Sequence, residues 1–211
     1  MDEGRTNRRA KPEERGDFTV KLTLEKRSIP HVRGAFVGKK IYLRPATLED
    51  YETRLMWNES ADPQRLRQTI EPIAPISRRL LEFEERNRDS ADTTQADLTV
   101  VNRADDGIIG MLSYRSLNLL NRSARLEVFG APDLRQSTEL VEALRLIVGY
   151  LYSQFNLNSV YAEVSELNTL ELQVFESLEF KCDGVLRQRH FFDGAFHDIR
   201  IYSLLRYETP R

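Results

Sequence analysis

The hydrophobic pattern changes its period near Thr138, and this change most constrains the fold. Before it, residues 97–103, 108–114 and 124–130 alternate as three short strands, the first two joined as a hairpin. After it, apolar residues recur every three or four positions, which predicts an amphipathic helix. That helical face is formed by Leu140, Leu144, Ile147, Val148, Leu151 and Phe155. Strands followed by a long helix predict a single α/β domain with a mixed, mostly antiparallel sheet.

The segment before these strands carries a helix start signal. A strand is expected from Lys39, after which Thr47 and Asp50 form a capping signature that opens a helix through Trp57. Ser77 is expected to cap a second helix. The folded domain is therefore predicted over residues 39–211, after a charged N-terminal extension and linker (1–38) that is partly disordered.

The segment after the long helix predicts a strand, a short helix and a closing hairpin. Residues 159–165 alternate as a strand, and residues 168–178 have helical spacing. The hairpin that follows closes around the two-residue turn Asp193-Gly194, a dipeptide that favours the type I′ turn of tight hairpins.

Composition narrows the classes of function. The 211 residues carry a formal net charge of −2, which gives no argument for nucleic-acid binding. The single cysteine, Cys182, excludes an internal disulfide framework and leaves too few thiolates for a structural zinc site. No apolar run approaches the roughly 18 residues of a membrane span, and the N-terminus lacks the apolar core of a signal peptide. A cytoplasmic protein without metal, nucleic acid or membrane is expected.

Three segments, in this order and at this spacing, resemble the GNAT superfamily of acyl-CoA-dependent N-acyltransferases. Within it, the chain looks most like the branch that acetylates the N-termini of ribosomal proteins. The segments are IYLRPATLEDYETRLMWNES (41–60), NLNSVYAEVSELNTLELQVFESLEF (156–180) and GVLRQRHFFDGAFHDIRIYSLL (184–205). The resemblance implies the GNAT fold for residues 39 to 207, and acetyl-CoA or another acyl-CoA as co-substrate.

The resemblance also implies where the acyl donor binds. Its pantetheine arm enters a gap between the fourth and fifth strands and pairs with backbone there, at Val128 and Phe129, while Asn168 orients it. The pyrophosphate rests on backbone N–H groups at the start of the next helix, where the positive end of the helix dipole favours an anion. The implied residues of this second part are Arg135, Gln136, Ser137, Thr138 and Glu139.

The usual glycine-rich phosphate loop is missing from this position. Only Arg135 agrees with the motif, and side chains on Thr138 and Leu140 would occupy space that glycines leave open. Glu139 adds a negative charge beside the pyrophosphate. Three such departures predict about a thousandfold weaker binding. The alternative is an ordinary helix start, with Ser137 as N-cap, Glu139 as a favourable early acid and Leu140 in the core.

The positions that carry chemistry in this family also depart from its pattern. Phe175 stands near the cofactor where a tyrosine often protonates the departing thiolate, and Glu171 stands where a small residue is usual. The fourth-strand glutamate that helps to take the amine proton is replaced by Arg125. Glu127 projects from the same strand face and is the candidate base, with Glu163 on the fifth strand as the other.

Two functions remain open at this point. The first is an N-acyltransferase with a weakened or altered cofactor site, which moves an acyl group from acyl-CoA to an N-terminal peptide or a small amine. The second is a non-catalytic GNAT-like module that binds a protein partner or regulates one.

The closing hairpin carries two further patterns. His190 and His197 should face each other across its turn, and are interpreted as an ordinary cross-strand pair. Phe191, Phe192 and Phe196 gather at the tip and suggest a contact with a second subunit, with a homodimer as the candidate arrangement.

Overall fold

The computed structural model describes residues 36–59, 74–88, 94–131 and 138–209, which belong to one compact unit, Val32–Arg211. The elements are β1 (Ile41–Pro45), α1 (Leu48–Glu59), α3 (Ile76–Arg88), β2 (Ala96–Asn102), β3 (Ile108–Asn118), β4 (Ser123–Gly130), α4 (Thr138–Gln154), β5 (Ser159–Ser165), α5 (Thr169–Ser177), β6 (Lys181–Phe192), β7 (Ala195–Leu205) and a 3₁₀ turn, η1 (Arg206–Glu208). The predicted α/β fold with a mixed sheet is confirmed.

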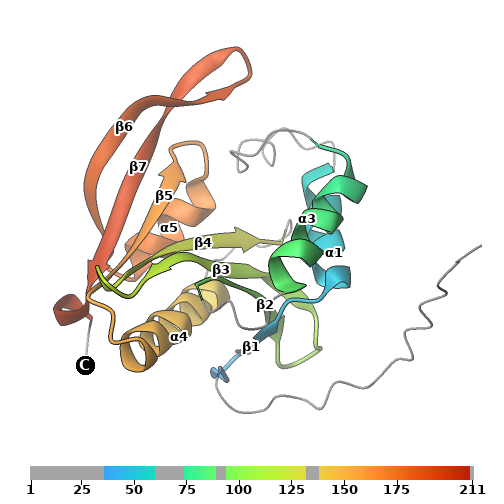
Figure 1. Ribbon diagram of the computed structural model, residues 1–211, viewed down its shortest axis with the longest axis horizontal. Coiled ribbons are helices and arrows are strands. Elements are labelled where there is room, and N and C mark those ends of the chain that lie inside the picture. The colour runs from blue at the N-terminus through green and yellow to red at the C-terminus, as the bar shows by residue number, and fades with distance from the viewer. Residues whose placement is uncertain (1–35, 60–73, 89–93, 132–137, 210–211) are drawn as a thin grey trace, which may run out of the picture. The chain divides into compact units, whose positions relative to one another are not determined.

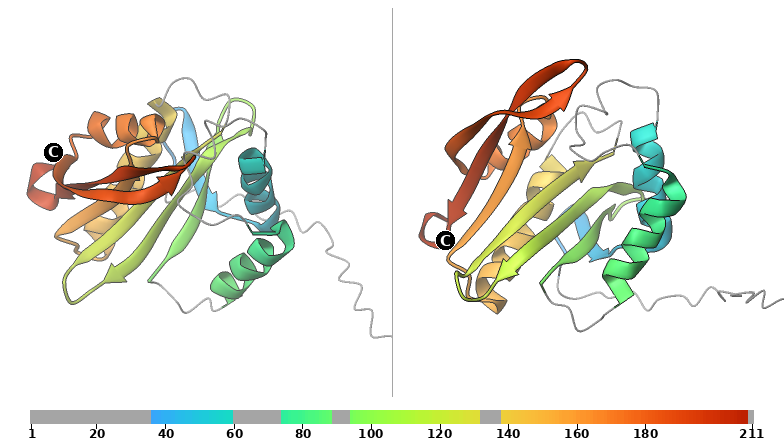
Figure 2. Two further views of the ribbon diagram at one scale, coloured as in Figure 1. Left: turned by 90° about the horizontal axis from the view of Figure 1, so that it is seen from above. Right: turned by 45° about the horizontal axis from the view of Figure 1, so that its top comes forward.

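The strands form one seven-stranded sheet in the order β1-β2-β3-β4-β5-β7-β6 (Figure 1). Every neighbouring pair is antiparallel except β4 and β5, which are parallel. Helices cover both faces (Figure 2): α4 and α5 pack on one, and α1 and α3 on the other. The sheet therefore separates two layers, and alternate residues of each strand face different helices.

The main core lies between the sheet and α4. The predicted apolar face of α4 is confirmed, since Leu140, Leu144, Ile147 and Leu151 are fully buried there. Gly110 on β3 makes this close approach possible. A Cβ atom added at Gly110 would lie 2.3 Å from the Phe129 carbonyl oxygen and 3.1 Å from Leu140 Cδ2.

A smaller core lies between the sheet and the α1–α3 pair. Tyr51 and Phe83 stack with ring centroids 4.5 Å apart, and Leu55 and Met111 complete this cluster. The cluster fixes α1 and α3 against the middle of the sheet, so that both helices border the face on which residues 125, 127 and 129 of β4 lie.

The start of α1 follows the predicted capping signature. The Thr47 hydroxyl accepts from the Asp50 N–H at 3.3 Å, and the Asp50 carboxylate accepts from the Thr47 N–H at 2.8 Å. Arg44 of β1 donates to both carboxylate oxygens of Asp50, at 2.5 and 2.8 Å. The cap thus also joins α1 to the first strand of the sheet.

The prediction for Ser77 is wrong. Helix α3 already begins at Ile76, and the Pro75 carbonyl accepts the first backbone hydrogen bonds, from the N–H groups of Arg78 and Arg79. Ser77 is the second residue of the helix and lies inside its first turn, so its hydroxyl is not at the N-cap position.

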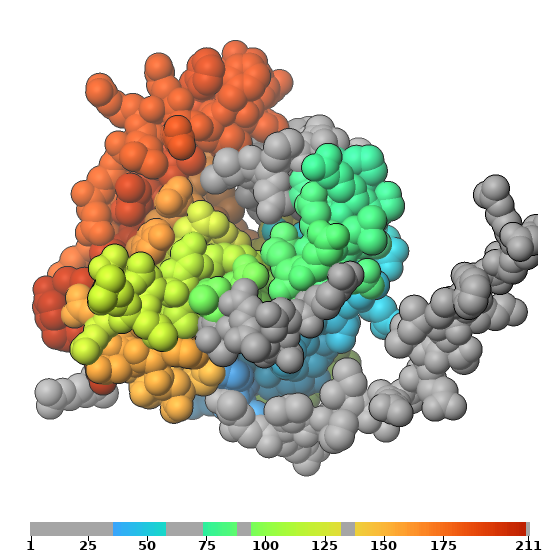
Figure 3. Space-filling model, in the orientation of Figure 1, coloured from blue at the N-terminus to red at the C-terminus, as the bar shows by residue number. Residues whose placement is uncertain are grey.

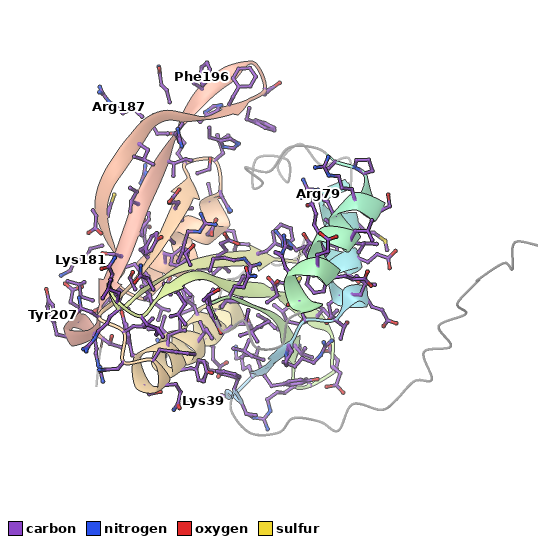
Figure 4. All side chains as sticks on the ribbon, in the orientation of Figure 1. Lys39, Arg79, Lys181, Arg187, Phe196 and Tyr207 are labelled. Atoms are coloured by element: carbon purple, nitrogen blue, oxygen red, sulfur yellow. The ribbon has the colours of Figure 1, made fainter. Side chains whose placement is uncertain are left out.

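The closing hairpin has the predicted two-residue turn. Phe192 pairs with Ala195, and Asp193 and Gly194 have φ angles of 50° and 76°, as a type I′ turn requires. Figure 4 labels Phe196 and Arg187, which lie toward the turn end of the hairpin, away from η1. Phe191 and Phe196 contact each other at 5.0 Å between ring centroids and are 60% and 62% exposed. Cover by a second subunit stays a prediction.

Among the helices in the described part of the chain, none has both the length and the apolar character needed to cross a membrane.

Candidate functional site

Strands β4 and β5 pair only over their first three residues. Ser123 pairs with Ser159, and Arg125 with Tyr161, after which the two strands diverge (Figure 1). Among the residues that the structure describes, the later part of β4 keeps its partner β3 but has no strand on its other side. Its backbone polar groups on that side are therefore available to a side chain or a ligand.

Helix α5 places a carboxyl group in this opening. Glu171 accepts a hydrogen bond from the backbone N–H of Val128 through Oε1, at 3.3 Å. Its other oxygen, Oε2, accepts from Nδ2 of Asn168 at 2.7 Å. Asn168 is the N-cap of α5, since its Oδ1 accepts from the Glu171 N–H at 3.1 Å. The helix cap and the carboxyl group therefore hold each other in place.

Burial changes the protonation of this carboxyl group. Loss of water around it raises the pKa of Glu171 to about 8, and the nearby negative charge of Glu127 adds to the rise. The hydrogen bond from Val128 and the positive charges of Arg54 and Arg125 oppose the rise without cancelling it. The raised pKa therefore favours the neutral form of this half-buried carboxyl group more than in an ordinary glutamate.

A ladder of charged side chains crosses the other face of the sheet, from β2 to β4. Asp97, Ser113 and Glu127 are register neighbours on the three strands. Asp97 accepts from Ser113 Oγ at 2.6 Å and from the Arg115 guanidinium. Glu127 accepts from Arg125 at 2.5 Å and lies 4.0 Å from Arg115. Four alternating charges therefore stand side by side on this face.

The ladder runs from the interior to the surface. Burial alone would raise the pKa of Asp97, but the charge of Arg115 and hydrogen bonds from Ser113 and Arg115 outweigh it and hold that pKa below its usual range. The Asp97 side chain is 3% exposed, whereas that of Glu127 is 41% exposed. Residues of β3 and β4 reach the surface between the closing hairpin and α3 (Figure 3). Glu127 is therefore accessible to a ligand on this face.

Aromatic residues border the ladder on the side of α1. Trp57 stacks on Phe129 with ring centroids 6.1 Å apart. The Arg54 guanidinium carbon lies 4.9 Å from the centroid of the Phe129 ring and 5.4 Å from that of Tyr51. Cation–π contacts of this kind hold the guanidinium in place.

The structure brings several of the predicted residues together at the opening. The N–H of Val128 lies in the opening although its side chain is in the core, and Asn168 stands beside it. Phe129 points its ring to the opposite face, so only its backbone can line the opening. Glu163 of β5 is exposed. Register alternation places it on the same sheet face as Glu127.

The predicted phosphate site is described only in part. Arg135, Gln136 and Ser137 lie outside the described residues. Glu139, in the first turn of α4, accepts from Thr138 Oγ1 at 2.7 Å and from Lys40 Nζ at 3.3 Å. These two contacts hold the pKa of Glu139 below its usual value, and Lys40 offsets its charge. The expected repulsion of a pyrophosphate is thus reduced.

The structure places two further side chains, and Leu140 lies in the core as the ordinary helix start implied. Leu140 is fully buried under the sheet, so its side chain does not occupy the space before α4, as its place on the apolar helix face already indicated. Phe175 is also fully buried and packs edge-on against Phe180 at 5.0 Å. A direct contact between the Phe175 ring and a cofactor is therefore not supported.

Sequence reasoning noted Glu171 as unusual but missed its contacts, and it missed Asp97 and Arg115 altogether. Strand alternation places a residue on a face, but only the register identifies its neighbours on other strands. In the described part of the chain, no group of three or more His, Cys, Asp or Glu side chains could hold a metal ion.

The mixed sheet opens between its two parallel strands, and a helix begins beyond the end of β4, as the GNAT resemblance implied. The family model described as "Acetyltransferase (GNAT) domain" matches residues 40–181. The chain therefore belongs to the GNAT acetyltransferase family.

Relatives and solved structures agree with this family. An uncharacterized N-acetyltransferase, p20, from Bacillus licheniformis is 23% identical over 171 residues, which cover 81% of this chain and 95% of that protein. The putative ribosomal N-acetyltransferase YdaF of Bacillus subtilis is 28% identical over 49% of this chain and 57% of that protein. The structure of spermidine N-acetyltransferase from Vibrio cholerae in complex with CoA and spermine superimposes with a TM-score of 0.69, at 19% identity over 81% of this chain and 98% of that one.

Proposed function

We propose that this chain transfers an acetyl or other acyl group from acyl-CoA to a primary amine. The observation that carries the proposal is the opening beside β4, where the Val128 N–H has no strand partner in the described part of the chain and donates to the Glu171 side chain. A backbone N–H fixed in this way can donate to an oxygen of a thioester donor and to the charge that develops on it. The arm of the donor would lie along the backbone of Val128 and Phe129.

The phosphates of the donor would lie at the start of α4. The backbone N–H groups of Thr138 and Glu139 belong to its first turn, where the helix dipole favours an anion. Arg135, Gln136 and Ser137 would complete the site. Because Glu139 is engaged by Lys40, we expect weak but measurable binding of CoA without loop glycines.

The acceptor amine would approach from the charged ladder. Glu127 is the candidate general base, because its carboxylate is exposed on the face next to the opening, and Glu163 is the alternative. Arg54, Arg115 and Arg125 share this face with the carboxylates of Asp97, Glu127 and Glu163, so charges of both signs would meet the acceptor. We infer that the acceptor is an N-terminal peptide amine, as the resemblance to the ribosomal-protein branch implies, and a similar relative is named a putative ribosomal N-acetyltransferase. A polyamine is the alternative acceptor, because other relatives are spermidine N(1)-acetyltransferases.

Calorimetric titration with desulfo-CoA, followed by turnover assays with acetyl-CoA, tests the reaction. N-terminal peptides should be acetylated in preference to spermidine. Replacement of the candidate base, Glu127→Gln, should lower kcat about 10²–10⁴-fold, and Glu163→Gln should lower kcat by a smaller factor. Absence of binding at millimolar desulfo-CoA together with absence of turnover would refute the proposal. Faster turnover of spermidine than of any peptide would refute only the acceptor class.

A second function is favoured by one observation. The Glu171 carboxyl group already occupies the Val128 N–H, the donor that a thioester would need. A domain that keeps this contact permanently would be a non-catalytic module that binds a protein partner. In such a module, neither the wild-type protein nor Glu171→Ala would bind CoA, because the rest of the cofactor site would be absent. The desulfo-CoA titration described above, carried out on both proteins, distinguishes the two functions.

A further inference from the structure

The carboxyl group of Glu171 is held at a defined place by two partners from different elements. One oxygen accepts from the Val128 N–H of β4, and the other from the Asn168 amide at the start of α5. Asn168 is itself buried, at 5% exposed, and accepts from the Glu171 N–H. The contact with Asn168 can therefore keep the carboxyl group beside the opening when a ligand takes the place of Oε1 at the Val128 N–H.

The Glu171 carboxyl group lies where the thioester of the proposed acyl donor would bind. The Val128 N–H is the backbone donor that would receive the thioester oxygen, and Oε1 of Glu171 stands 3.3 Å from that nitrogen. A thioester oxygen that replaced Oε1 would leave the Glu171 carboxyl group next to the thioester, still joined to Asn168 through Oε2. In this arrangement Glu171 would lie within reach of the sulfur atom of the donor.

The same helix supplies no other acid at this point. Phe175 lies one turn after Glu171 on the same helix face, is fully buried and has no proton to donate. The two positions are four residues apart, but only Glu171 reaches the opening, so its carboxyl group is the acid that α5 places there.

We propose that Glu171 is the general acid of the acyl transfer and protonates the departing thiolate of CoA. This inference rests on the function proposed above. The amine nitrogen attacks the thioester carbon, the C–N bond forms and the C–S bond breaks. The amine gives one proton to Glu127, and the sulfur takes one from Glu171. Exchange with water then returns both carboxyl groups to their starting states, so that the products are the amide and the CoA thiol.

Its charged neighbours make Glu171 suited to this task. Glu127 from β4 raises its pKa in addition to burial, and Arg125 from β4 and Arg54 from α1 lower it, with a result of about 8. An acid with this pKa holds its proton at neutral pH and is matched to a thiol, whose ordinary pKa is about 8.5. The rate should therefore fall as the pH rises through about 8, where Glu171 loses its proton.

The test compares the wild-type protein with Glu171→Gln, with Glu84→Gln on the exposed side of α3 as the control. Turnover of acetyl-CoA is measured from pH 6 to 10, binding of desulfo-CoA by calorimetry, and the titration of the Glu171 carboxyl carbon by NMR in ¹³C-glutamate-labelled protein. We expect Glu171→Gln to lower kcat about 10²–10⁴-fold, to lose the decline above pH 8 and to keep desulfo-CoA affinity within about threefold. The NMR signal should titrate near pH 8.

Two results would overturn the assignment. Turnover of Glu171→Gln at the wild-type rate with an unchanged pH profile would mean that the carboxyl group donates no proton. A variant that binds desulfo-CoA much more tightly and turns over faster would mean that Glu171 blocks the opening. In both cases the acyltransferase function would stand. Failure of the wild-type protein to bind desulfo-CoA or turn over acetyl-CoA would instead refute that function, and the acid assignment with it.

Discussion

Ala124, Leu126 and Val128 on one face of β4 are 0%, 1% and 7% exposed and pack under α4, whereas Arg125 and Glu127 on the other face keep more than a third of their side-chain surface exposed. The first face is stabilised by removal of apolar surface from water, which needs no particular partner atoms. The second is held by charged pairs whose members depend on each other. Residues that stabilise the fold and candidate reactive residues therefore lie on opposite faces of the same strand.

The largest effect is expected on the apolar face. Leu144→Ala should lower the free energy of unfolding by about 3–5 kcal/mol, because Leu144 is fully buried in α4 and its loss leaves a cavity. Its exposed neighbour on the same helix provides the control, since Arg145→Ala should change stability by less than about 0.5 kcal/mol. Urea unfolding measures both. Equal effects would mean that α4 does not carry the core.

The next effect concerns the buried end of the charged ladder. Asp97→Ala should cost about 2–3 kcal/mol at pH 7, because it leaves Arg115 and Ser113 without their acceptor. The native pKa of Asp97 is lowered, so its contribution is present above the unfolded value of 3.8 and is lost as the pH falls below it.

The difference between wild-type protein and this variant should therefore shrink below about pH 4. Asp183→Ala, at an exposed position of β6, is the matched control. A difference that stays constant from pH 7 to pH 3 would show that the charge of Asp97 is not involved.

The Glu171 carboxyl group should make the stability of the protein fall with rising pH, which is opposite to the effect of Asp97. The pKa of Glu171 is raised from 4.5 to about 8 in the folded protein, so the folded state binds the proton more tightly and wild-type stability falls as the pH rises between these values. Glu171→Gln cannot ionise, and it should be more stable than the wild-type protein by about 1–3 kcal/mol at pH 9.

At pH 4 this advantage should be absent, because both side chains are then neutral. Urea unfolding at pH 4, 7 and 9 measures the trend. Parallel stabilities of the two proteins across this range would mean that Glu171 has an ordinary pKa and lies closer to water than the structure indicates.

The smallest effect on stability is expected at the exposed end of the ladder. Glu127→Gln should change the free energy of unfolding by less than about 1 kcal/mol, since its pair with Arg125 is screened by solvent. Turnover should nevertheless fall strongly if Glu127 is the base. Combined urea unfolding and activity measurements would separate the two. A large loss of stability would contradict the division of β4 into a stabilising and a reactive face.

Much of the fold could be predicted because short local sequence patterns determine its helices, strands and turns. The apolar face of α4 follows from residues three and four apart, the start of α1 from Thr47 and Asp50, and the hairpin turn from Asp193 and Gly194. Each of these signals spans a few residues, so the backbone conformation that it favours does not depend on distant partners.

The candidate site depended on resemblance and on tertiary structure. The resemblance implied a gap beside the fourth strand and gave it Val128 and Asn168, but it also assigned the cofactor a contact with Phe175, which is buried. Nothing in the local pattern around Phe175 distinguishes a residue that lines an opening from one that fills the core behind it.

The sequence by itself determined which segments are helices and strands and which residues lie on their apolar faces. Only the tertiary structure decided that Glu171 meets the Val128 N–H, across 43 residues, and that Asp97, Arg115 and Glu127 stand side by side. The physical reason is that strand order, register and the point where β4 leaves β5 are set by packing of the whole sheet. The contacts and the protonation of the site follow from that packing.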